Sequence, residues 1–345
     1  MKKNLRKTIR IISSLLTAAL LISLTACGSS ASSSEVPTVE GAKYVFKLAG
    51  IGTSATQIDP VAVGIEKGFF AEEGIEVKDV GEVDVLQFVA LLESGSVDAG
   101  LTMESDIVAA IDVGADIVEV AVGPAVTREK PHMAYVVLEN SPIKSGADIK
   151  AAKIGLTGLN GCNVGFLYEY AALNGIKDPA RELDVTSSSA PALLEALRAG
   201  QLDLTALHGT TNEEVIKRIY PDLRVLFTDY DFAEDRAGDI GWCLRRSWAE
   251  EDPDRARAFV AAIAKSNNFV NNNPEEALEI YRKVAKTELN EKIFQTPYYA
   301  KDGLIQESHV QYWIDTLSKP NSFQPLQNKD IKFEDVATNK YNPHK

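Results

Sequence analysis

The stretch most suggestive of chemistry is a short polar turn. Thr157–Asn163 reads TGLNGCN and lies between an apolar strand that ends at Leu156 and a helical pattern that begins near Phe166. Strand, loose turn and helix together point free backbone N–H groups and the positive end of a helix at one spot. Such a spot holds an anion or the negative end of a small polar molecule. We therefore predict ligand contacts from Asn160, Gly161, Cys162 and Asn163.

Three further loops take the same position, each directly after an expected strand. They read GTSA at 52–55, TMES at 102–105 and HGTT at 208–211. In a parallel sheet the carboxyl ends of the strands share one edge, so these loops are expected to face one cleft. A strand expected at 240–244 also places a tryptophan where it can wall that cleft. The predicted contacts are Thr53, Ser54, Glu104, Ser105, His208, Thr210 and Trp242.

Each of these residue types also has a structural interpretation, and these alternatives stay open. A hydroxyl can cap a helix, and a glutamate in a first turn is stabilised by the helix dipole even when it is solvated. Histidine can simply occupy the surface, glycine a tightly packed position, and tryptophan the core. The alternatives are capping for Ser54, Ser105 and Thr210, a solvated acid for Glu104, a surface position for His208, close packing for Gly161 and a core position for Trp242.

The elements that must hold these loops alternate along the chain. Alternating or continuous apolar runs predict strands, and apolar residues at helical spacing predict helices between them. This alternation predicts a mostly parallel sheet with helices on both faces. Strands are expected at 44–48, 75–80, 97–101, 117–122, 134–138, 183–186, 202–207 and 223–227, and helices at 57–67, 83–93, 105–113, 190–199, 210–220, 253–269 and 304–317.

Two segments of the chain echo each other. Ala90–Ala99 reads ALLESGSVDA and Ala196–Leu204 reads ALRAGQLDL, so each has a helix that closes on glycine before an aspartate and a buried strand. The recurrence at matching places predicts two similar lobes. After Asp239 the strand expected at 240–244 crosses back to the first lobe, and 321–345 is a mixed tail.

Composition narrows the class of protein. The 345 residues carry a formal net charge of -13, and no Lys or Arg cluster follows residue 10, which argues against a nucleic-acid binder. The cysteines are Cys27, Cys162 and Cys243, none of them in a C-x-x-C pair, and the four histidines are scattered. This pattern suggests neither a structural zinc site nor a disulfide framework.

The N-terminus has the features of an export signal. A basic start with five Lys or Arg residues precedes an apolar run at 11–24, which is too short for a comfortable membrane span. The sequence LTACG around Cys27 resembles the bacterial lipobox, and the serine-rich residues after it suit a flexible tether. We predict a lipoprotein signal peptide at 1–26, lipidation of Cys27, a tether at 27–43 and an extracytoplasmic protein anchored to the membrane by lipid.

A longer motif indicates a family. Gly64–Val77, GIEKGFFAEEGIEV, resembles a passage of ABC-transporter solute-binding proteins of the nitrate/sulfonate/taurine type, a family that includes binders of thiamine pyrimidine precursors. Ser94–Asp98, Gly200–Asp203 and Asn273–Ala277 resemble later passages of the same family, and the likeness covers about 44–285. It implies an α/β fold of two Rossmann-like lobes joined by two hinge crossings, the type II periplasmic-binding-protein architecture. The implied lobes are 44–130 plus 237–345, and 131–236.

The resemblance also implies a function. We expect the solute-binding component of an ABC importer, with an ABC permease and its ATPase as partners. Two lobes that face each other form a cleft that closes by hinge bending and excludes water. We expect a monomer with no catalytic residue, no cofactor and no metal.

The ligand is expected to be a small organic anion or zwitterion. Backbone donors and hydroxyls suit a sulfonate, carboxylate or nitrate, and no arginine lies in the predicted loops. If Glu104 points inward it favours an amine, so a zwitterion such as taurine satisfies both features. The alternative is a thiamine pyrimidine precursor or another aromatic heterocycle, which needs stacking walls. Candidates for those walls are Trp242, Tyr230, Phe232, Tyr298 and Tyr299.

Other classes of function stay open as well. An enzyme on the same fold can be imagined with Cys162 beside His208, because both loops are expected to face the cleft. A sensor or adhesin that keeps the fold is a third possibility.

Overall fold

The computed structural model describes residues 38–83, 87–159, 161–209 and 211–345. The expected signal peptide, the lipidation site Cys27 and the tether up to residue 37 lie outside the described residues. Residues 34–345 form one compact unit. Within the described ranges, every helix is too short or too polar to cross a membrane.

Four early strands and one late strand, β1 to β4 and β11, form what we call the first strand group. β1 (Tyr44–Leu48) pairs in parallel with β2 (Ile75–Asp79). β11 (Ile240–Arg245) lies between β3 (Ala99–Met103) and β4 (Ile117–Val122) and is antiparallel to both. The late strand therefore returns to the early ones, as the sequence predicts.

A five-stranded sheet uses the middle of the chain. Its order is β10 (Leu223–Thr228), β6 (Met133–Leu138), β9 (Leu204–His208), β7 (Lys153–Leu156) and β8 (Asp184–Ser187). β7 is parallel to β8 and β9, whereas β6 is antiparallel to β9 and β10.

The prediction of a mostly parallel sheet is therefore wrong, because antiparallel pairs occur in both groups of strands. The physical reason lies in how the chain enters each sheet. β6 and β11 each follow a segment that connects the two groups, so neither is the next strand of a β–helix–β crossover. The spacing of apolar residues predicts where strands and helices lie. It does not indicate the direction of a strand that follows such a connection.

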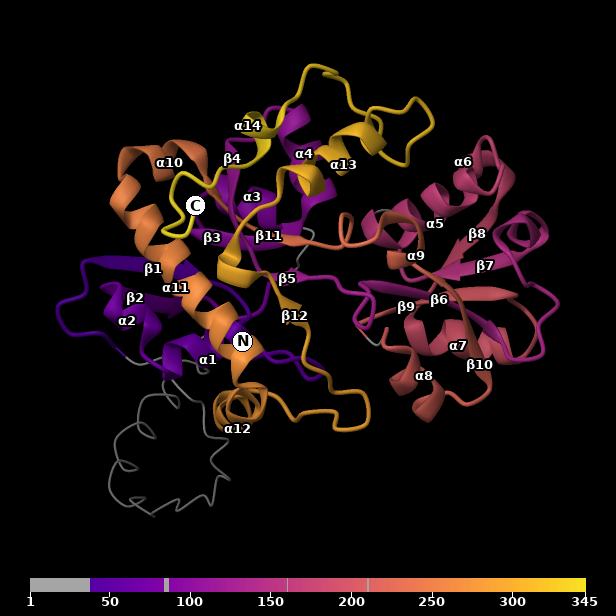
Figure 1. Cartoon of the computed structure of the whole chain (residues 1–345), viewed down its shortest axis with the longest axis horizontal. Helices are drawn as coiled ribbons and strands as arrows, with labels where there is room; N and C mark the ends of the chain where they lie inside the picture. Colours follow the sequence, from indigo (N-terminus) through magenta and orange to yellow (C-terminus); the bar gives the residue numbers. More distant parts are fainter. Residues whose placement is uncertain (1–37, 84–86, 160, 210) are drawn as a thin grey trace, which may run out of the picture. The chain divides into compact units, whose positions relative to one another are not determined.

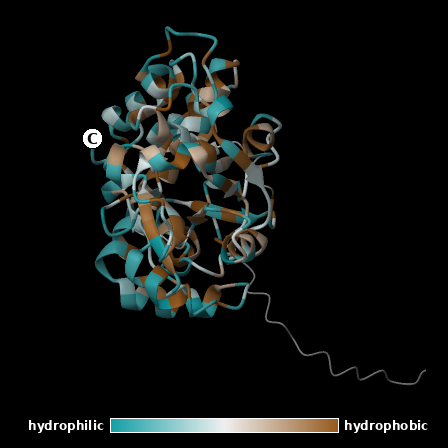
Figure 2. Cartoon of the chain, turned by 90° about the vertical axis from the view of Figure 1, so that its right-hand side faces the viewer, coloured by the Kyte–Doolittle hydropathy of each residue, from teal (hydrophilic) through white to brown (hydrophobic). Residues whose placement is uncertain are grey.

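Helices cover both faces of the five-stranded sheet, as predicted. Along β6 the odd-numbered side chains, such as Tyr135, pack in one apolar cluster with Phe166 of α5 (Gly161–Leu173). The even-numbered Ala134 and Val136 pack with Leu193 of α7 (Ala190–Arg198) and with α8 (Glu213–Ile219). Figure 1 shows α5 on one side of this sheet and α7 and α8 on the other. In Figure 2 the strands are mostly brown and the outer helices carry teal.

The longest helix, α11 (Pro253–Asn272), covers the first strand group. Phe259 on this helix stacks on Phe46 of β1 with 4.9 Å between ring centroids. The other elements are α1 (Pro60–Glu66), α2 (Phe69–Glu72), α3 (Phe88–Glu93), α4 (Glu104–Asp112), β5 (Pro124–Ala125), α6 (Pro179–Glu182), α9 (Tyr230–Ala233), α10 (Arg246–Glu251), α12 (Pro274–Val284), β12 (Tyr298–Tyr299), α13 (Glu307–Leu317), α14 (Phe333–Val336) and the 3-10 turns η2 (Gly146–Ala151) and η3 (Lys301–Gly303).

Two helices begin later than predicted because a polar side chain caps them. The helix predicted at 57–67 starts at Pro60, where Asp59 Oδ1 accepts a hydrogen bond of 2.8 Å from Val61 N. The helix predicted at 210–220 starts after Asn212, whose Oδ1 accepts a hydrogen bond of 3.1 Å from Val215 N. The caps fix the start of each helix.

The C-terminal segment binds elements from both groups of strands. α13 and α14 pack against α4. Trp313 of α13 also lies 5.6 Å from Phe166 of α5, between ring centroids, and Phe323 contacts Gly165 on the same helix. The boundaries of the two predicted lobes stay a prediction, but this segment contacts both of them.

Candidate ligand-binding site

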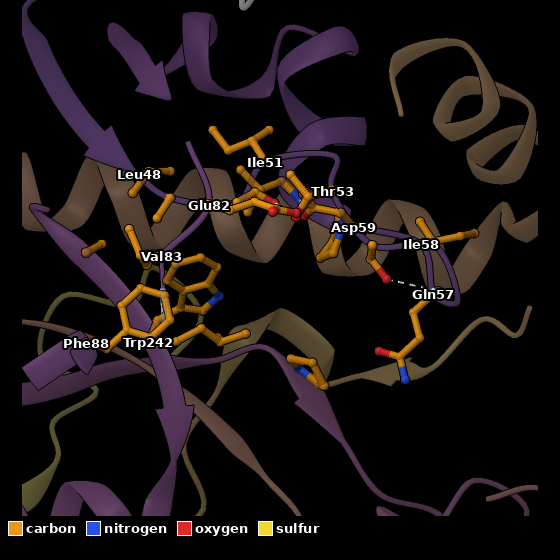
Figure 3. Close-up of a pocket in the computed structure, with 18 of the residues that line it drawn as sticks. Leu48, Ile51, Thr53, Gln57, Ile58, Asp59, Glu82, Val83, Phe88 and Trp242 are labelled. Atoms are coloured by element: carbon orange, nitrogen blue, oxygen red, sulfur yellow. Dashed lines mark hydrogen bonds between the residues drawn. The ribbon is translucent and has the colours of Figure 1, made fainter. Parts of the chain in front are cut away.

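A cavity of about 490 Å³, the main cavity, opens in the first strand group (Figure 3). It lies at the carboxyl end of β1 and beside β3 and β11, and the loop after β1, the start of α1 and Phe88 of α3 border it. Figure 3 shows the rings of Phe88 and Trp242 in its lower part and the polar loop residues Thr53 and Asp59 above them. The lining residues that matter below are Leu48, Gly50, Ile51, Thr53, Ser54, Gln57, Asp59, Glu82, Phe88, Leu101, Pro124, Trp242 and Tyr299.

The loop after β1 is held in shape by its own backbone and by one carboxylate. Gly50 N donates to Gly81 O at 2.9 Å, and Gly52 N donates to Asp59 Oδ2 at 2.9 Å. Gly52 has a φ of 71°, which only glycine adopts readily, and a Cβ there would lie 3.1 Å from Val284 O. Burial raises the pKa of Asp59, while the N–H groups of Gly52 and Val61 pull it back down. Asp59 therefore fixes both the loop and the start of α1.

Three predicted contacts, Thr53, Ser54 and Trp242, line the main cavity. The two hydroxyls are already engaged: Thr53 Oγ1 donates to Gly50 O at 2.9 Å, and Ser54 Oγ accepts from Gln57 N at 3.1 Å. Trp242 is 9% exposed and packs edge-on against Phe259. Trp242 thus has one side in the core and one side on the cavity, and its contact with a ligand stays a prediction.

Glu104 and Ser105 lie elsewhere. Both are fully buried at the start of α4, and neither lines the main cavity. The interpretation of Glu104 as a solvated acid is wrong, because the helix packs over β3 and encloses the carboxyl group. Ser105 does not cap the helix either, since Met103 occupies the N-cap position.

Glu104 belongs to a buried acidic cluster in the first strand group. Both carboxylate oxygens of Glu104, and both of Glu119 on β4, have no hydrogen-bond partner among the described residues. Burial raises the pKa of both groups well above the ordinary value, and neighbouring acids including Asp239 add to the shift. The buried Cys243 thiol also has a raised pKa, chiefly through burial and then through Glu119 and Glu104. Burial therefore favours the protonated form of each of these groups.

Cys162 and His208 meet at the edge of the five-stranded sheet together with a residue the sequence reasoning missed. His132 Nε2 lies 3.1 Å from His208 Nε2, and Cys162 is the third member of the cluster. His132 directly precedes Met133, which pairs with His208 across β6 and β9. His132 could have been located from the sequence if β6 had been predicted to pair antiparallel with β9, because that pairing brings the start of β6 next to His208. Cys162 and Cys243 are free thiols.

The remaining residues of the opening turn shape the backbone. Tyr135 Oη donates to Asn163 O at 2.6 Å, and Thr157 Oγ1 donates to Asn163 Oδ1 at 3.1 Å. Gly161 has a φ of 62°, and a Cβ at this position would meet no described atom within 4 Å. Backbone conformation rather than close packing therefore explains the glycine. The predicted contacts Asn160 and Thr210 lie outside the described residues.

A second cavity of about 70 Å³ adjoins the first. His132, His208 and Lys130 line it, and Gln57 and Pro124 line both cavities. Among the proposed aromatic walls, Tyr299 lines the main cavity and Tyr298 the second. Phe232 instead packs among the rings of Phe166, Tyr170 and Phe227, and Arg128 lies over Tyr230.

The two cavities differ in charge. Asp59 and Glu82 are the charged side chains among the described residues of the main cavity, and Lys130 is the basic residue of the second. Phe88, Gln57 and the two acids were missed by sequence reasoning. Phe88 is one turn into an expected helix and carries no polar signal, and Gln57 was expected inside a helix that begins three residues later.

The fold is that of the periplasmic binding proteins. The alkanesulfonate-binding protein of Xanthomonas axonopodis, solved with bound MOPS, matches with a TM-score of 0.62 and 13% identity over 85% of this chain and 98% of that one. The nitrate-binding protein of Synechocystis matches with a TM-score of 0.59 and 14% identity over 86% of each chain.

The family follows from the sequence. The family model described as NMT1/THI5 like matches residues 55–277, and the chain belongs to this family. The formylaminopyrimidine-binding protein of Halalkalibacterium halodurans is 24% identical over 280 residues, which cover 80% of this chain and 78% of that protein.

Proposed function

We propose that this protein is an extracytoplasmic solute-binding protein that captures a small planar nitrogen heterocycle of the thiamine-pyrimidine kind and delivers it to an ABC permease and its ATPase. The observation that carries the proposal is the composition of the main cavity. Aromatic rings from Phe88, Trp242 and Tyr299 border it, together with two acids. Aromatic walls favour a flat ring, and carboxylates accept hydrogen bonds from ring amino groups.

The same cavity is poorly suited to the small anion that was the first expectation from sequence. No described lining residue is Lys, Arg or His. The N–H groups of Gly50, Gly52 and Thr53 already donate to Gly81 O, Asp59 Oδ2 and Gly50 O. A sulfonate placed here would lose its hydration without meeting a cationic side chain or these three N–H groups. An anion or zwitterion therefore remains the second choice.

The relatives give separate support to the heterocycle. A curated relative named for formylaminopyrimidine binding matches over most of both chains. Another, from Haemophilus influenzae, is called a putative thiamine biosynthesis protein and is 23% identical over 81% of this chain. Membrane anchoring through Cys27 belongs to the same proposal and rests on the lipobox-like sequence. Partnership with a permease rests on the likeness to solute-binding proteins.

The raised pKa of the Cys162 thiol favours a binding protein over an enzyme. Burial raises the pKa of the Cys162 thiol to about 12, and Asp106 adds to the shift. A protonated thiol is a poor nucleophile. The enzyme alternative requires Cys162 to react with iodoacetamide faster than a free thiol does.

The test is isothermal titration of the chain from residue 34 onward, with formylaminopyrimidine, taurine and nitrate as separate ligands. We expect heat from the pyrimidine alone. Trp242→Ala should weaken binding at least about fivefold, because stacking of a flat base on an aromatic side chain is worth about 1–3 kcal/mol. Trp242→Phe, which keeps a ring, should retain most of the affinity. Heat from taurine or nitrate with silence from the pyrimidine would overturn the choice of ligand.

A matched pair of variants distinguishes an effect on the shape of the cavity loop from a general loss of protein stability. Asp59→Ala and Asp252→Ala each remove a helix cap, on α1 beside the cavity and on α11 away from it. Each should cost about 1–2 kcal/mol of stability. Only Asp59→Ala should also weaken binding of the pyrimidine, because Asp59 bonds to the cavity loop and lines the main cavity, whereas Asp252 does neither.

A further inference from the structure

Three potential metal ligands converge at one edge of the five-stranded sheet for a topological reason. β6 is antiparallel to β9, so the start of one and the end of the other meet, and Met133 pairs with His208. β7 is parallel to β9, and the chain passes from its end into α5. His132, His208 and Cys162 therefore come from three elements that share one edge.

Their distances suit a tetrahedral cation. One ligand atom from each of the three side chains lies within 4.8 Å of the others, and the two Nε2 atoms are 3.1 Å apart. Around tetrahedral zinc, bond lengths of about 2.0–2.1 Å to nitrogen and about 2.3 Å to sulfur place two nitrogens about 3.3 Å apart and sulfur and nitrogen about 3.6 Å apart. The two nitrogens are already close to their tetrahedral separation, and binding of the metal requires the sulfur–nitrogen distances to approach about 3.6 Å.

The chemistry of the cluster also suits a metal. The two imidazoles already face each other, with their Nε2 atoms 3.1 Å apart, and an imidazole nitrogen is a common metal ligand in its neutral form. A set of one thiol and two imidazoles selects zinc and similar transition metals over magnesium and calcium.

We propose that His132, Cys162 and His208 bind one Zn²⁺ ion, with Cys162 as the thiolate ligand. The thiol proton leaves to solvent as the metal–sulfur bond forms, so no oxidant or reductant is needed. Three protein ligands leave a fourth position free.

The solute that the protein is proposed to bind is a candidate for the fourth coordination position. His132 and His208 line the second cavity, which adjoins the main cavity through Gln57 and Pro124. A ring nitrogen of a bound heterocycle, or a water, can then complete the coordination. This last step rests on the proposed function, whereas binding of the metal itself does not.

The experiment is a titration of the metal-free unit of residues 34–345 with Co²⁺, a spectroscopic substitute for zinc, followed by competition with Zn²⁺. We expect one ion per chain, a near-ultraviolet thiolate-to-cobalt band and the visible bands of tetrahedral cobalt. Cys162→Ser should abolish the near-ultraviolet band. His132→Gln and His208→Gln should each weaken Zn²⁺ binding at least about 100-fold.

The matched control is His344→Gln, because His344 is an exposed histidine near the C-terminus and away from the cluster. This variant should bind Co²⁺ as the wild type does. Far-ultraviolet circular dichroism of each variant shows that it is folded. Absence of the thiolate band in the wild type, or its persistence in Cys162→Ser, would overturn the proposal. Because the cobalt spectrum requires no solute, its failure is distinct from a failure to bind pyrimidine.

Discussion

At the scale of single residues, Glu104 and Glu119 are the most unusual groups of this protein. They are fully buried, and their oxygens have no hydrogen-bond partner among the described residues. An ionised carboxylate in that position is costly, so the folded state keeps its protons to a higher pH than the unfolded chain does. Glu119 also packs tightly, because a Cβ at Gly241 would lie 2.5 Å from its Cδ.

Glu119→Gln should therefore stabilise the protein at pH 8. The folded pKa of Glu119 is raised above its ordinary value of 4.5, so wild-type stability falls as the pH rises through the window that begins near 4.5. Each pH unit inside that window costs about 1.4 kcal/mol, and the neutral amide avoids this cost. We expect a gain on the order of 1 kcal/mol or more at pH 8 and little change at pH 4. Urea unfolding at both pH values measures it, and a variant less stable than wild type at pH 8 would contradict the assignment.

Sequence reasoning pointed to some residues of the candidate site and missed others for identifiable reasons. Thr53 and Trp242, which line the main cavity, were proposed because each follows from the position of a strand. His132 was missed because the contact that places it, across β6 and β9, is an antiparallel pairing that the alternation of elements did not predict. Glu104 was predicted at the start of a helix, and α4 does begin there. A sequence pattern does not show whether an acid in the first turn of a helix is buried.

At the scale of elements, the C-terminal segment fastens onto α5. The ring of Phe323 lies where a side chain on Gly165 would go, with its nearest atom 2.7 Å from a Cβ position. Lys319 forms an ion pair with Glu169 on the same helix. The tail is thus a packed part of the fold, which its mixed sequence did not indicate.

Gly165→Ala should destabilise the protein by about 1–3 kcal/mol, because the added methyl group overlaps the Phe323 ring. Alanine in a free helix position is normally more stable than glycine by about 1 kcal/mol. In a Phe323→Ala background the same change should therefore be neutral or stabilising. Thermal unfolding of the two single variants and the double variant forms the cycle. Equal effects of Gly165→Ala in both backgrounds would show that the tail does not pack there.

Element types were predicted better than element directions. The alternation of apolar residues placed strands and helices, and the caps at Asp59 and Asn212 account for the shifted helix starts. Strand order and direction depend on contacts between segments far apart in the chain, such as β11 with β3 and β4. Local periodicity contains no information about those contacts.

At the scale of the whole molecule, the position of the main cavity bears on whether the two predicted lobes close around a bound solute. The residues that line it, from Leu48 to Tyr299, all belong to the segments predicted to form the first lobe. Gly161, Asn163 and His208, predicted contacts from the second lobe, do not line it. If a bound solute is gripped from both sides, the chain must bend at the segments that connect the two groups of strands.

Those connecting segments are held at specific points. Asp229 Oδ1 accepts a hydrogen bond of 2.7 Å from Met133 N, and burial raises the pKa of Asp229 to about 7. In the second connection Asp239 Oδ2 lies 2.7 Å from Nδ1 of His309 on α13. Bending therefore has to occur around these contacts, and solute binding should change how often the connecting backbone opens.

We predict that a saturating pyrimidine slows amide hydrogen exchange both in the cavity loop at 50–59 and in the connection at 229–239. The loop is protected because the solute covers it, and the connection because closure restricts its opening. Hydrogen-exchange mass spectrometry with and without the ligand measures both, and α7, which packs on the five-stranded sheet and does not line the main cavity, is an internal reference that should not change. Protection confined to 50–59 would mean that the first strand group binds the solute by itself, and the clamp formed by two halves would have to be abandoned.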